Sequence, residues 1–378
     1  MKEQTWQGTL TEVEGFEVGH AEDLEALTGV TVVLCRSGAV GALSLRGGAV
    51  GGRQLSPLDP QHLVDRVHGV MLAGGSAFGL AAADGALLAL EREGVGFDVS
   101  GTLVPILPSA VIFDLKVGDG KVRPGPAMGE AAVAAASRAP VAQGCRGAGA
   151  GASIGKLLGV PCATKGGLGS AGARFADGLA IGALAVVNAF GDVRDPASGR
   201  ILAGARRGPG SRRFADTWAM VTRGRFPGED DEDGEDGGQE GDCGGQDGDG
   251  GGQDCDGGGQ DCDGGERAAG VAVGGASGSP ENTTLGVVVT NARLTALEAQ
   301  WAARLAGDAF ARVLWPGGTR YDGDLVFLLS CGEIQADPHR VGLLGREALE
   351  ESMLRAVRLA EPLGGLPSAS ELEGLQIG

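Results

Sequence analysis

The chain has 378 residues, of which 72 are glycine, and a formal net charge of −18. Hydrophobic residues make up 42%, enough for a sizeable core, but aromatic residues only 4%, so Ala, Val, Leu and Ile must build that core. The glycines follow no Gly-X-Y period, which excludes a collagen helix. A strongly negative chain is a poor partner for nucleic acid or an anionic membrane surface, so we expect neither.

Most of the negative charge lies in one low-complexity tract, residues 227–266. The tract holds sixteen Asp and Glu residues and no Lys or Arg, and the rest of the chain has a net charge of −2. It includes three tandem heptads at 244–250, 251–257 and 258–264. Low hydrophobicity with high charge predicts a disordered insertion. Calcium binding by its Asp-X-Asp-Gly units is the alternative, but a period of seven matches neither a calcium β-helix nor an EF-hand loop.

Cysteine usage and the N-terminus point to the cytoplasm. The seven cysteines, three of them in the acidic tract, lack the paired spacing of a disulfide framework, which favours a reducing compartment. The first ten residues, MKEQTWQGTL, contain no apolar stretch of the kind found in secretory signals. No apolar run approaches about 18 residues, so we expect no membrane span.

Hydrophobic periodicity predicts alternating strands and helices along the rest of the chain. In chain order these are strands at 30–35 and 69–73, helices at 76–93 and 130–137, a strand or strand pair at 178–190, a strand at 284–290, a helix at 295–313, a strand at 325–331 and a helix at 343–360. The alternation favours a parallel doubly wound sheet, whereas short glycine-rich connections favour antiparallel neighbours. The pattern alone leaves both open.

Familiar catalytic motifs are scarce. The four histidines lack metal-ligand spacing, and there is no H-E-x-x-H, no C-x-x-C and no complete P-loop, so a histidine-rich zinc site is not expected. Residues 151–155 match the G-x-S-x-G nucleophile elbow around Ser153. Residues 144–152 make a poor strand, however, and a glycine loop that enters a helix at 153–158 is the plainer interpretation.

The most informative segment follows the acidic tract. There Asn282 and Thr283 bring a small hydroxyl residue to the start of the strand predicted at 284–290, and Tyr321-Asp322-Gly323-Asp324 directly precedes the strand at 325–331. Further blocks occur upstream at 15–20 (GFEVGH), 74–80 (GGSAFGL), 164–170 (TKGGLGS) and 186–192 (VVNAFGD). This ordered set resembles the family of L-aminopeptidase/D-esterases, β-peptidyl aminopeptidases and 6-aminohexanoate-oligomer hydrolases.

The resemblance extends over roughly 10–225 and 268–362. It implies an α/β fold, a four-layer α/β/β/α sandwich like that of the ornithine acetyltransferases. Residues 1–226 and 267–378 would then form a single self-processing hydrolase domain, with an α part up to 282, a β part from 283, and 227–266 as an insertion. It also implies homo-oligomers, commonly tetramers of processed protomers, and neither a metal nor an organic cofactor.

Members of this family cut themselves, and the resemblance implies a cut between Asn282 and Thr283. The hydroxyl of Thr283 would attack the carbonyl of Asn282, and hydrolysis of the resulting ester would free Thr283 as an N-terminal nucleophile. A free α-amine has a pKa of about 7.7–8.0, so it can act as general base for the hydroxyl of its own residue. This pairing needs no histidine, which suits a chain with few of them.

The resemblance assigns four further residues. Asp322 and Asp324 would hold the new amine through charge-assisted hydrogen bonds, Lys165 would bring a cation to the nucleophile, and Asn188 would supply an oxyanion-hole amide. Each residue also has a purely structural interpretation. In it, Asp322 and Asp324 belong to an ordinary Asp-Gly-Asp turn, Lys165 to a solvated loop and Asn188 to a turn at the end of a strand. Phe113 stands where members often have a tyrosine, so this position offers no hydroxyl.

The implied function is a self-cleaving amidohydrolase that acts on peptides or small linear amides through an acyl-Thr283 ester. The Asn-Thr-Thr start resembles the nylon-oligomer branch, since aminopeptidase members more often start with serine. An aminopeptidase is the close alternative; it needs a carboxylate for the substrate ammonium, and Asp114 is the one acid in 104–116. An acyltransferase of the ornithine acetyltransferase kind, a serine hydrolase at Ser153 and a cation-binding scaffold are further alternatives.

Overall fold

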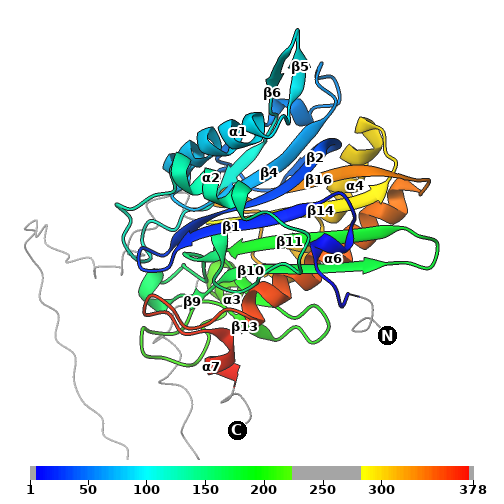
Figure 1. Ribbon diagram of the computed structural model, residues 1–378. Helices are drawn as coiled ribbons and strands as arrows, with labels where there is room; N and C mark the ends of the chain where they lie inside the picture. The colour runs from blue at the N-terminus through cyan, green and yellow to red at the C-terminus, as the bar shows by residue number, and fades with distance from the viewer. Residues whose placement is uncertain (1–5, 224–281, 374–378) are drawn as a thin grey trace, which may run out of the picture.

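A mixed β-sheet of nine strands organises the residues that this computed structural model describes, 6–223 and 282–373 (Figure 1). The order is β10-β11-β14-β16-β2-β4-β7-β3, and β1 also pairs with β2. β14–β16 and β4–β7 are parallel and the other pairs antiparallel. The bounds are β1 (Glu17–Asp23), β2 (Thr28–Leu45), β3 (Gly52–Arg53), β4 (Val67–Ala73), β7 (Ser109–Val111), β10 (Gly167–Arg174), β11 (Ala180–Asn188), β14 (Thr283–Ala292) and β16 (Leu325–Ile334).

The long strand β2 joins two halves of this sheet. Its residues 28–34 pair with β1 and β4, whereas residues 40–45 pair with β16. The register against β4 shifts between Leu34 and Ala39, and irregularities of this kind bend a strand. Gly38, inside the shift, has a φ of +82°, which glycine adopts without strain. The bend lets one face of each half turn toward the other.

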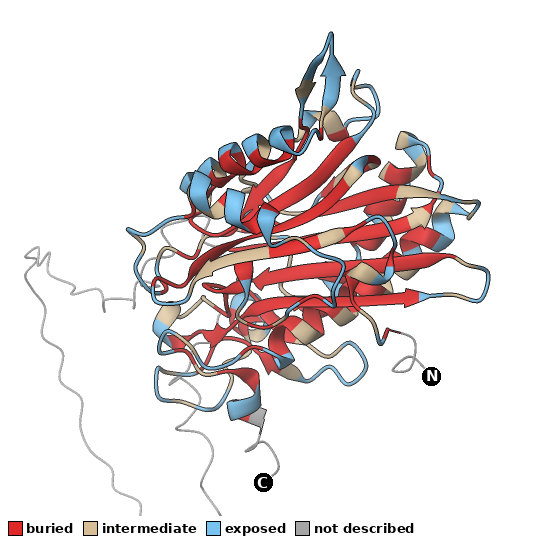
Figure 2. Cartoon of the chain, viewed as in Figure 1, coloured by how far each residue is buried: buried red, intermediate tan, exposed pale blue. Residues whose placement is uncertain are grey.

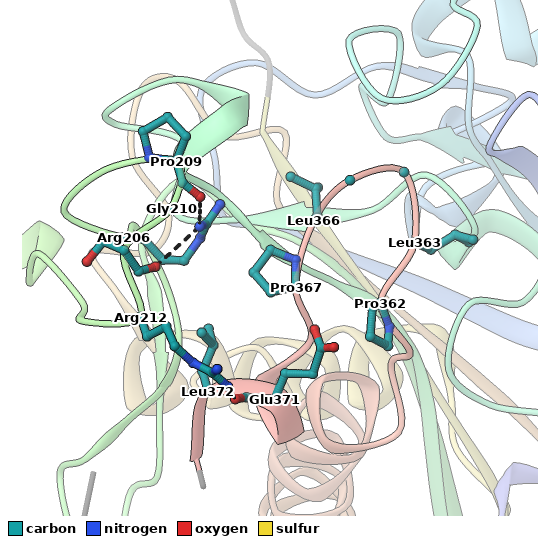
Figure 3. Close-up of a pocket in the computed structure, with 13 residues that line it drawn as sticks. Arg206, Pro209, Gly210, Arg212, Pro362, Leu363, Leu366, Pro367, Glu371 and Leu372 are labelled. Atoms are coloured by element: carbon teal, nitrogen blue, oxygen red, sulfur yellow. Dashed lines mark hydrogen bonds between the residues drawn. The ribbon is translucent and has the colours of Figure 1, made fainter. Parts of the chain in front are cut away.

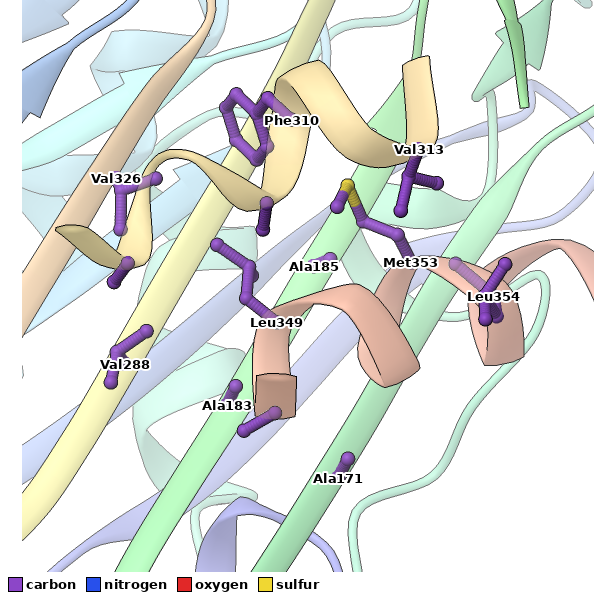
Figure 4. Close-up of a cluster of buried hydrophobic side chains, with 14 of the residues drawn as sticks. Ala171, Ala183, Ala185, Val288, Phe310, Val313, Val326, Leu349, Met353 and Leu354 are labelled. Carbon is purple, nitrogen blue, oxygen red and sulfur yellow. The ribbon is translucent and has the colours of Figure 1, made fainter. Parts of the chain in front are cut away.

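Three clusters of buried apolar side chains separate four layers. The central cluster lies between the sheet halves and joins Val33 and Leu72 to Val287 and Phe327. Successive strand residues face opposite sides, so the intervening residues pack outward. Those of β14 and β16 pack under α4, α5 and α6 (Figure 4), and those of β2 and β4 pack under α1 and α2. This is the predicted α/β/β/α sandwich.

Helices cover the two outer faces, and the strands between them are buried (Figures 1 and 2). Small residues bring α6 close to the sheet: a Cβ on Gly169 would lie 2.1 Å from the carbonyl oxygen of Ser352. The helices are α1 (Ala82–Arg92), α2 (Pro126–Ala134), α3 (Thr217–Arg223), α4 (Ala296–Ala306), α5 (Ala309–Val313), α6 (Pro338–Arg358) and α7 (Ala369–Glu373). The remaining short strands are β5 (Phe97–Val99), β6 (Thr102–Val104), β8 (Ser153–Ile154), β9 (Thr164–Lys165), β12 (Asp192–Arg194), β13 (Ile201–Ala203) and β15 (Leu314–Trp315).

Most predicted elements are present, with corrections to three elements and to the arrangement of the sheet. The helix predicted at 295–313 is two helices, α4 and α5, and the one at 76–93 begins as a 3-10 turn over Ser76–Ala81. The helix predicted at 153–158 is wrong, because β8 occupies its start and a turn follows. The parallel doubly wound alternative is also wrong, because most strand pairs are antiparallel. The acidic tract and its heptads lie outside the described residues.

None of the helices among the described residues combines the length and hydrophobicity needed to cross a bilayer. Among the same residues, no group of three or more His, Cys, Asp or Glu side chains is arranged to hold a metal ion.

Candidate active site

The candidate site lies at one end of the sheet, where β14 and β16 begin and β11 ends. Thr283, the first residue of β14, pairs with Asn188, the last residue of antiparallel β11. Asn282 forms a parallel bridge with Asp322, just before β16. Strand register therefore gathers four of the residues assigned from the sequence, although they come from distant parts of the chain.

The bond between Asn282 and Thr283 has a nucleophile and a hydrogen-bond donor beside it. The hydroxyl of Thr283 donates to the carbonyl oxygen of Asn282 at 2.6 Å, and the backbone N–H of Gly323 donates to the same oxygen at 2.8 Å. An N–H in this position polarises the carbonyl and can stabilise the oxyanion formed on attack. A Cβ on Gly323 would lie 2.6 Å from Thr283 Oγ1, so the approach requires glycine.

Asp322 and Asp324 are buried beside this bond and hold backbone around it. Asp322 Oδ2 accepts from the N–H and the hydroxyl of Thr319, at 2.8 and 2.6 Å. Asp324 accepts from the N–H of Thr284 at 2.5 Å and from that of Gly318 at 3.0 Å. The pair thus fixes the start of β14 against the loop that carries Gly323.

Burial also changes the charge of this pair. Loss of solvent raises the pKa of Asp322, and it raises the pKa of Asp324 to about 8, with the nearby charge of Asp322 as a second cause. Two carboxylates this close disfavour double ionisation. At neutral pH the pair therefore carries fewer than two negative charges.

The amide of Asn188 is held on both sides. Its Oδ1 accepts from the N–H of Ser153 at 3.0 Å and from Lys156 Nζ at 2.7 Å, and its Nδ2 donates to the carbonyl of Phe113 at 3.0 Å. Lys156 Nζ also donates to the backbone carbonyl of Asn188 at 3.0 Å. The orientation of this buried amide opposite Thr283 is therefore fixed.

Lys156 is the residue that the sequence analysis missed. Its positive charge lowers the pKa of Asp114, Asp322 and Asp324, although burial outweighs it in each case. The sequence offered a signal, because Lys156 follows Gly155 directly after the Ser153 motif. Because a helix was predicted at 153–158, this lysine was expected to be an ordinary surface residue of that helix.

Lys165 has a different environment from the one assigned to it. Its ammonium is fully buried and donates to the carbonyls of Gly149, Ala152 and Gly166, at 3.3, 2.9 and 2.8 Å. Burial lowers its pKa to about 8. Among the described residues its hydrogen bonds thus join the loop segments beside Asn188, and none reaches Thr283.

Asp114 is buried, and each of its two carboxylate oxygens accepts a hydrogen bond. Oδ1 accepts from the N–H of Gly75 at 2.7 Å and Oδ2 from the hydroxyl of Thr28 at 2.8 Å, so the carboxylate anchors a turn. Ser153 lies in β8, followed by a turn, which does not form the strand-to-helix elbow that a serine hydrolase of this type needs.

A separate cavity of about 620 Å³ lies between residues 206–212 and the C-terminal segment 362–372 (Figure 3). Arg206 lines it, but its guanidinium donates to backbone carbonyls, including those of Pro161 and Ala163. None of the residues that line this cavity belongs to the group around Thr283.

Comparison with known proteins identifies the family. The model of the family described as "Peptidase family S58" matches residues 8–369. The chain belongs to peptidase family S58. It is accordingly a peptidase, and so a hydrolase, as the resemblance predicted.

Relatives within family S58 carry two kinds of name. An uncharacterized aminopeptidase of Mycobacterium leprae is 35% identical over 390 residues, 95% of this chain and 92% of the relative. A 6-aminohexanoate-oligomer endohydrolase of Kocuria sp. is 28% identical over 355 residues, 91% of this chain and 80% of that protein.

Solved structures support the fold. The β-aminopeptidase of a Burkholderia species has a TM-score of 0.59 at 18% identity, with 97% of this chain and 92% of that chain covered. The L-aminopeptidase D-Ala-esterase/amidase of Ochrobactrum anthropi, described as a variant of the Ntn hydrolase fold, has a TM-score of 0.60 at 18% identity, with 95% and 88% covered.

Proposed function

We propose that this member of family S58 cuts itself between Asn282 and Thr283 and then hydrolyses linear peptide or amide bonds through an acyl-Thr283 ester. The observation that carries the proposal is the pair of hydrogen bonds on one oxygen: the Thr283 hydroxyl and the Gly323 N–H both donate to the carbonyl of Asn282. A nucleophile, an electrophile and an oxyanion donor thus meet at the bond to be cut.

Maturation proceeds by an N-to-O acyl shift. Thr283 Oγ1 attacks the carbonyl carbon of Asn282, and the Gly323 N–H binds the oxyanion. The C–N bond then breaks, the nitrogen of Thr283 takes the hydroxyl proton, and an ester joins Asn282 to Thr283 Oγ1. Water hydrolyses this ester, which leaves a carboxylate on Asn282 and a free amine on Thr283.

Turnover repeats this chemistry on a separate substrate. The free amine of Thr283 accepts the proton of its own hydroxyl as the latter attacks the substrate carbonyl, and returns a proton to the leaving amine. Water then releases the acid from the acyl-Thr283 ester. Asp322 and Asp324 hold the amine and the start of β14 in register.

Asn188 and a lysine complete the proposed machinery. Asn188 supplies its amide beside Thr283, and Lys156 provides the cation there, the role that the resemblance assigned to Lys165. We assign Lys165 a supporting role, because it ties together the carbonyls of the loop on which Lys156 and Ser153 lie.

We infer that the substrate is a linear amide with a blocked or uncharged acyl half. The aminopeptidase alternative needs a carboxylate for the substrate ammonium, and both oxygens of Asp114 already bind protein groups. The acyltransferase alternative differs only in passing the acyl group to an amine, and product analysis with an added amino acceptor separates the two.

The remaining parts of the proposal rest on sequence composition and on the family resemblance. They are a single hydrolase domain formed by 1–226 and 267–378, with 227–266 as an insertion, a cytoplasmic location, and homo-oligomers, as tetramers of processed protomers. Native mass spectrometry of the processed protein tests the assembly.

Trapping of the acyl-enzyme tests the catalytic proposal. Hydrolysis of an N-acetylated amino-acid p-nitroanilide, quenched with acid during turnover, should leave the acyl mass on the 96-residue fragment that begins at Thr283. Digestion should place it in the peptide that carries Thr283. Turnover with the acyl group on another residue, such as Ser153, would contradict the proposal.

A further inference from the structure

Two aromatic rings meet just beyond the strands that carry the site. Phe190 lies two residues after Asn188, and Tyr321 directly precedes Asp322. Their ring centroids are 6.1 Å apart at an interplanar angle of 42°, and both side chains are half-buried. Both residues are therefore partly open to solvent.

Strand register places both rings on the acyl side of that bond, the side of Asn282. In antiparallel β11 and β14, Asn188 pairs with Thr283, so the residues after Asn188 extend toward the acyl side. In the parallel bridge, Asp322 pairs with Asn282, so Tyr321 lies one residue farther in the same direction. Two independent registers thus agree on the location of the pair.

We propose that Phe190 and Tyr321 form the subsite for the acyl half of the substrate and select an apolar, uncharged acyl group. The inference rests on the proposed function. A substrate carbonyl must meet Thr283 Oγ1 and the Gly323 N–H as the carbonyl of Asn282 does. The acyl substituent on that carbonyl must then extend in the direction that the chain takes at Asn282, which is along the two rings.

The charges around the rings oppose an ammonium group there. Arg320 lies over the ring of Tyr321, 5.3 Å from its centroid, and Lys156 donates to Asn188 two residues before Phe190. The carboxylate of Asp322 also faces this region, but its Oδ2 accepts two hydrogen bonds from Thr319. A cationic acyl group would meet two positive charges and a carboxylate already occupied, whereas an alkyl chain would meet ring surface.

A chain-length series of p-nitroanilides tests the subsite. The wild-type enzyme should show a rise in kcat/KM from the acetyl to the hexanoyl anilide and a fall for the 6-aminohexanoyl anilide, which carries an ammonium. Phe190→Ala and Tyr321→Ala should each lose about tenfold on the hexanoyl anilide and much less on the acetyl anilide. Tyr321→Phe, which keeps the ring, should retain the preference.

Phe175 provides the matched control. It is also half-buried, pairs with Trp6 at 5.9 Å and has Arg340 over its ring at 5.8 Å, but it lies between β10 and β11, at the end of β11 opposite Asn188. Phe175→Ala should leave the preference unchanged. Self-cleavage, which is intramolecular, should still yield two fragments in all four variants and reports that each has folded.

The outcomes separate the two claims. Equal losses on the acetyl and hexanoyl anilides, or none, in cleaved Phe190→Ala and Tyr321→Ala would overturn the subsite and leave the proposed function standing. A faster wild-type reaction on the 6-aminohexanoyl anilide than on the hexanoyl anilide would overturn the preference for an uncharged acyl group. An uncut wild-type chain without activity on any anilide would overturn the proposed function, and the subsite with it.

Discussion

Gly323 should control the rate of self-cleavage although it contributes no side chain. In Gly323→Ala the new Cβ would lie 2.6 Å from Thr283 Oγ1, 3.0 Å from the carbonyl oxygen of Ala49 and 3.3 Å from Thr283 Cγ2. A Cβ cannot approach an oxygen to 2.6 Å, and Thr283 Oγ1 is on a short, buried side chain. The variant must therefore separate the hydroxyl and the Gly323 N–H from their positions at the Asn282 carbonyl.

The expected decrease in the rate of self-cleavage follows from the loss of one hydrogen-bond donor to the oxyanion. Removal of one oxyanion donor costs about 10²–10³ in rate, or roughly 2.7–4 kcal/mol of activation free energy. We expect Gly323→Ala to cleave itself at least about 100-fold more slowly than the wild-type chain. The assay follows the conversion of the full chain into its two fragments by denaturing electrophoresis and intact mass during and after expression.

Gly210→Ala is the control for this prediction. Gly210 also lies in a loop, but no atom lies within 4 Å of the position that its Cβ would take, so cleavage should proceed at the wild-type rate. Cleavage of Gly323→Ala as fast as that of Gly210→Ala would refute the assignment of the Gly323 N–H as the oxyanion donor.

Three further predictions concern charges and the acidic tract. Lys156→Met should slow self-cleavage at least about tenfold by removing the cation from Asn188. Lys165→Met should instead lower the free energy of unfolding by about 3 kcal/mol, because three buried carbonyls lose their donor. Cleavage time courses and urea titration measure the two effects, and the reverse pattern would show that Lys165 and not Lys156 supplies the cation near Thr283. The folded pKa of Asp324, about 8, lies above its ordinary value of 3.8, so the folded chain binds more protons and stability falls as pH rises toward 8. In the uncleaved Thr283→Ala background, the free energy of unfolding should drop by about 1–2 kcal/mol between pH 6.5 and 8, and Asp324→Asn should flatten this slope; equal slopes would contradict the assignment. Deletion of 227–266 should raise the isoelectric point while leaving the melting temperature and self-cleavage nearly unchanged; a large loss of stability would show that the tract is folded, and a calcium titration would follow.

The sequence predicted the elements of this fold better than their arrangement. Apolar runs such as 284–290 and 325–331 marked two central strands correctly, because a strand buried on both faces is apolar almost throughout. Periodicity could not decide between parallel and antiparallel pairing, because both give the same side-chain alternation. The four layers came from the family resemblance, and the structure explains them through the bend of β2 near Gly38.

For the candidate site, too, residue identities were predicted better than their spatial arrangement. Thr283, Asn188 and Asp322 were assigned from the family resemblance, and strand register brings them together. Lys156 was missed because residues 153–158 were predicted as a helix. Lys165 was assigned from the family resemblance, and the burial of its ammonium against three backbone carbonyls has no signature in a sequence. Gly323 and Phe113 contribute backbone groups, and the sequence alone does not show which backbone groups face the site.

The position of the N-terminus of the small fragment tests the central claim most directly. N-terminal sequencing and intact mass of the purified wild-type protein should give two associated chains of 282 and 96 residues, with the smaller chain beginning Thr283-Thr284-Leu285. Thr283→Ala should remain a single inactive chain, and Thr283→Ser should still cut. An active wild-type protein that stays uncut, or a cut at another bond, would contradict the assignment of Thr283 as the nucleophile.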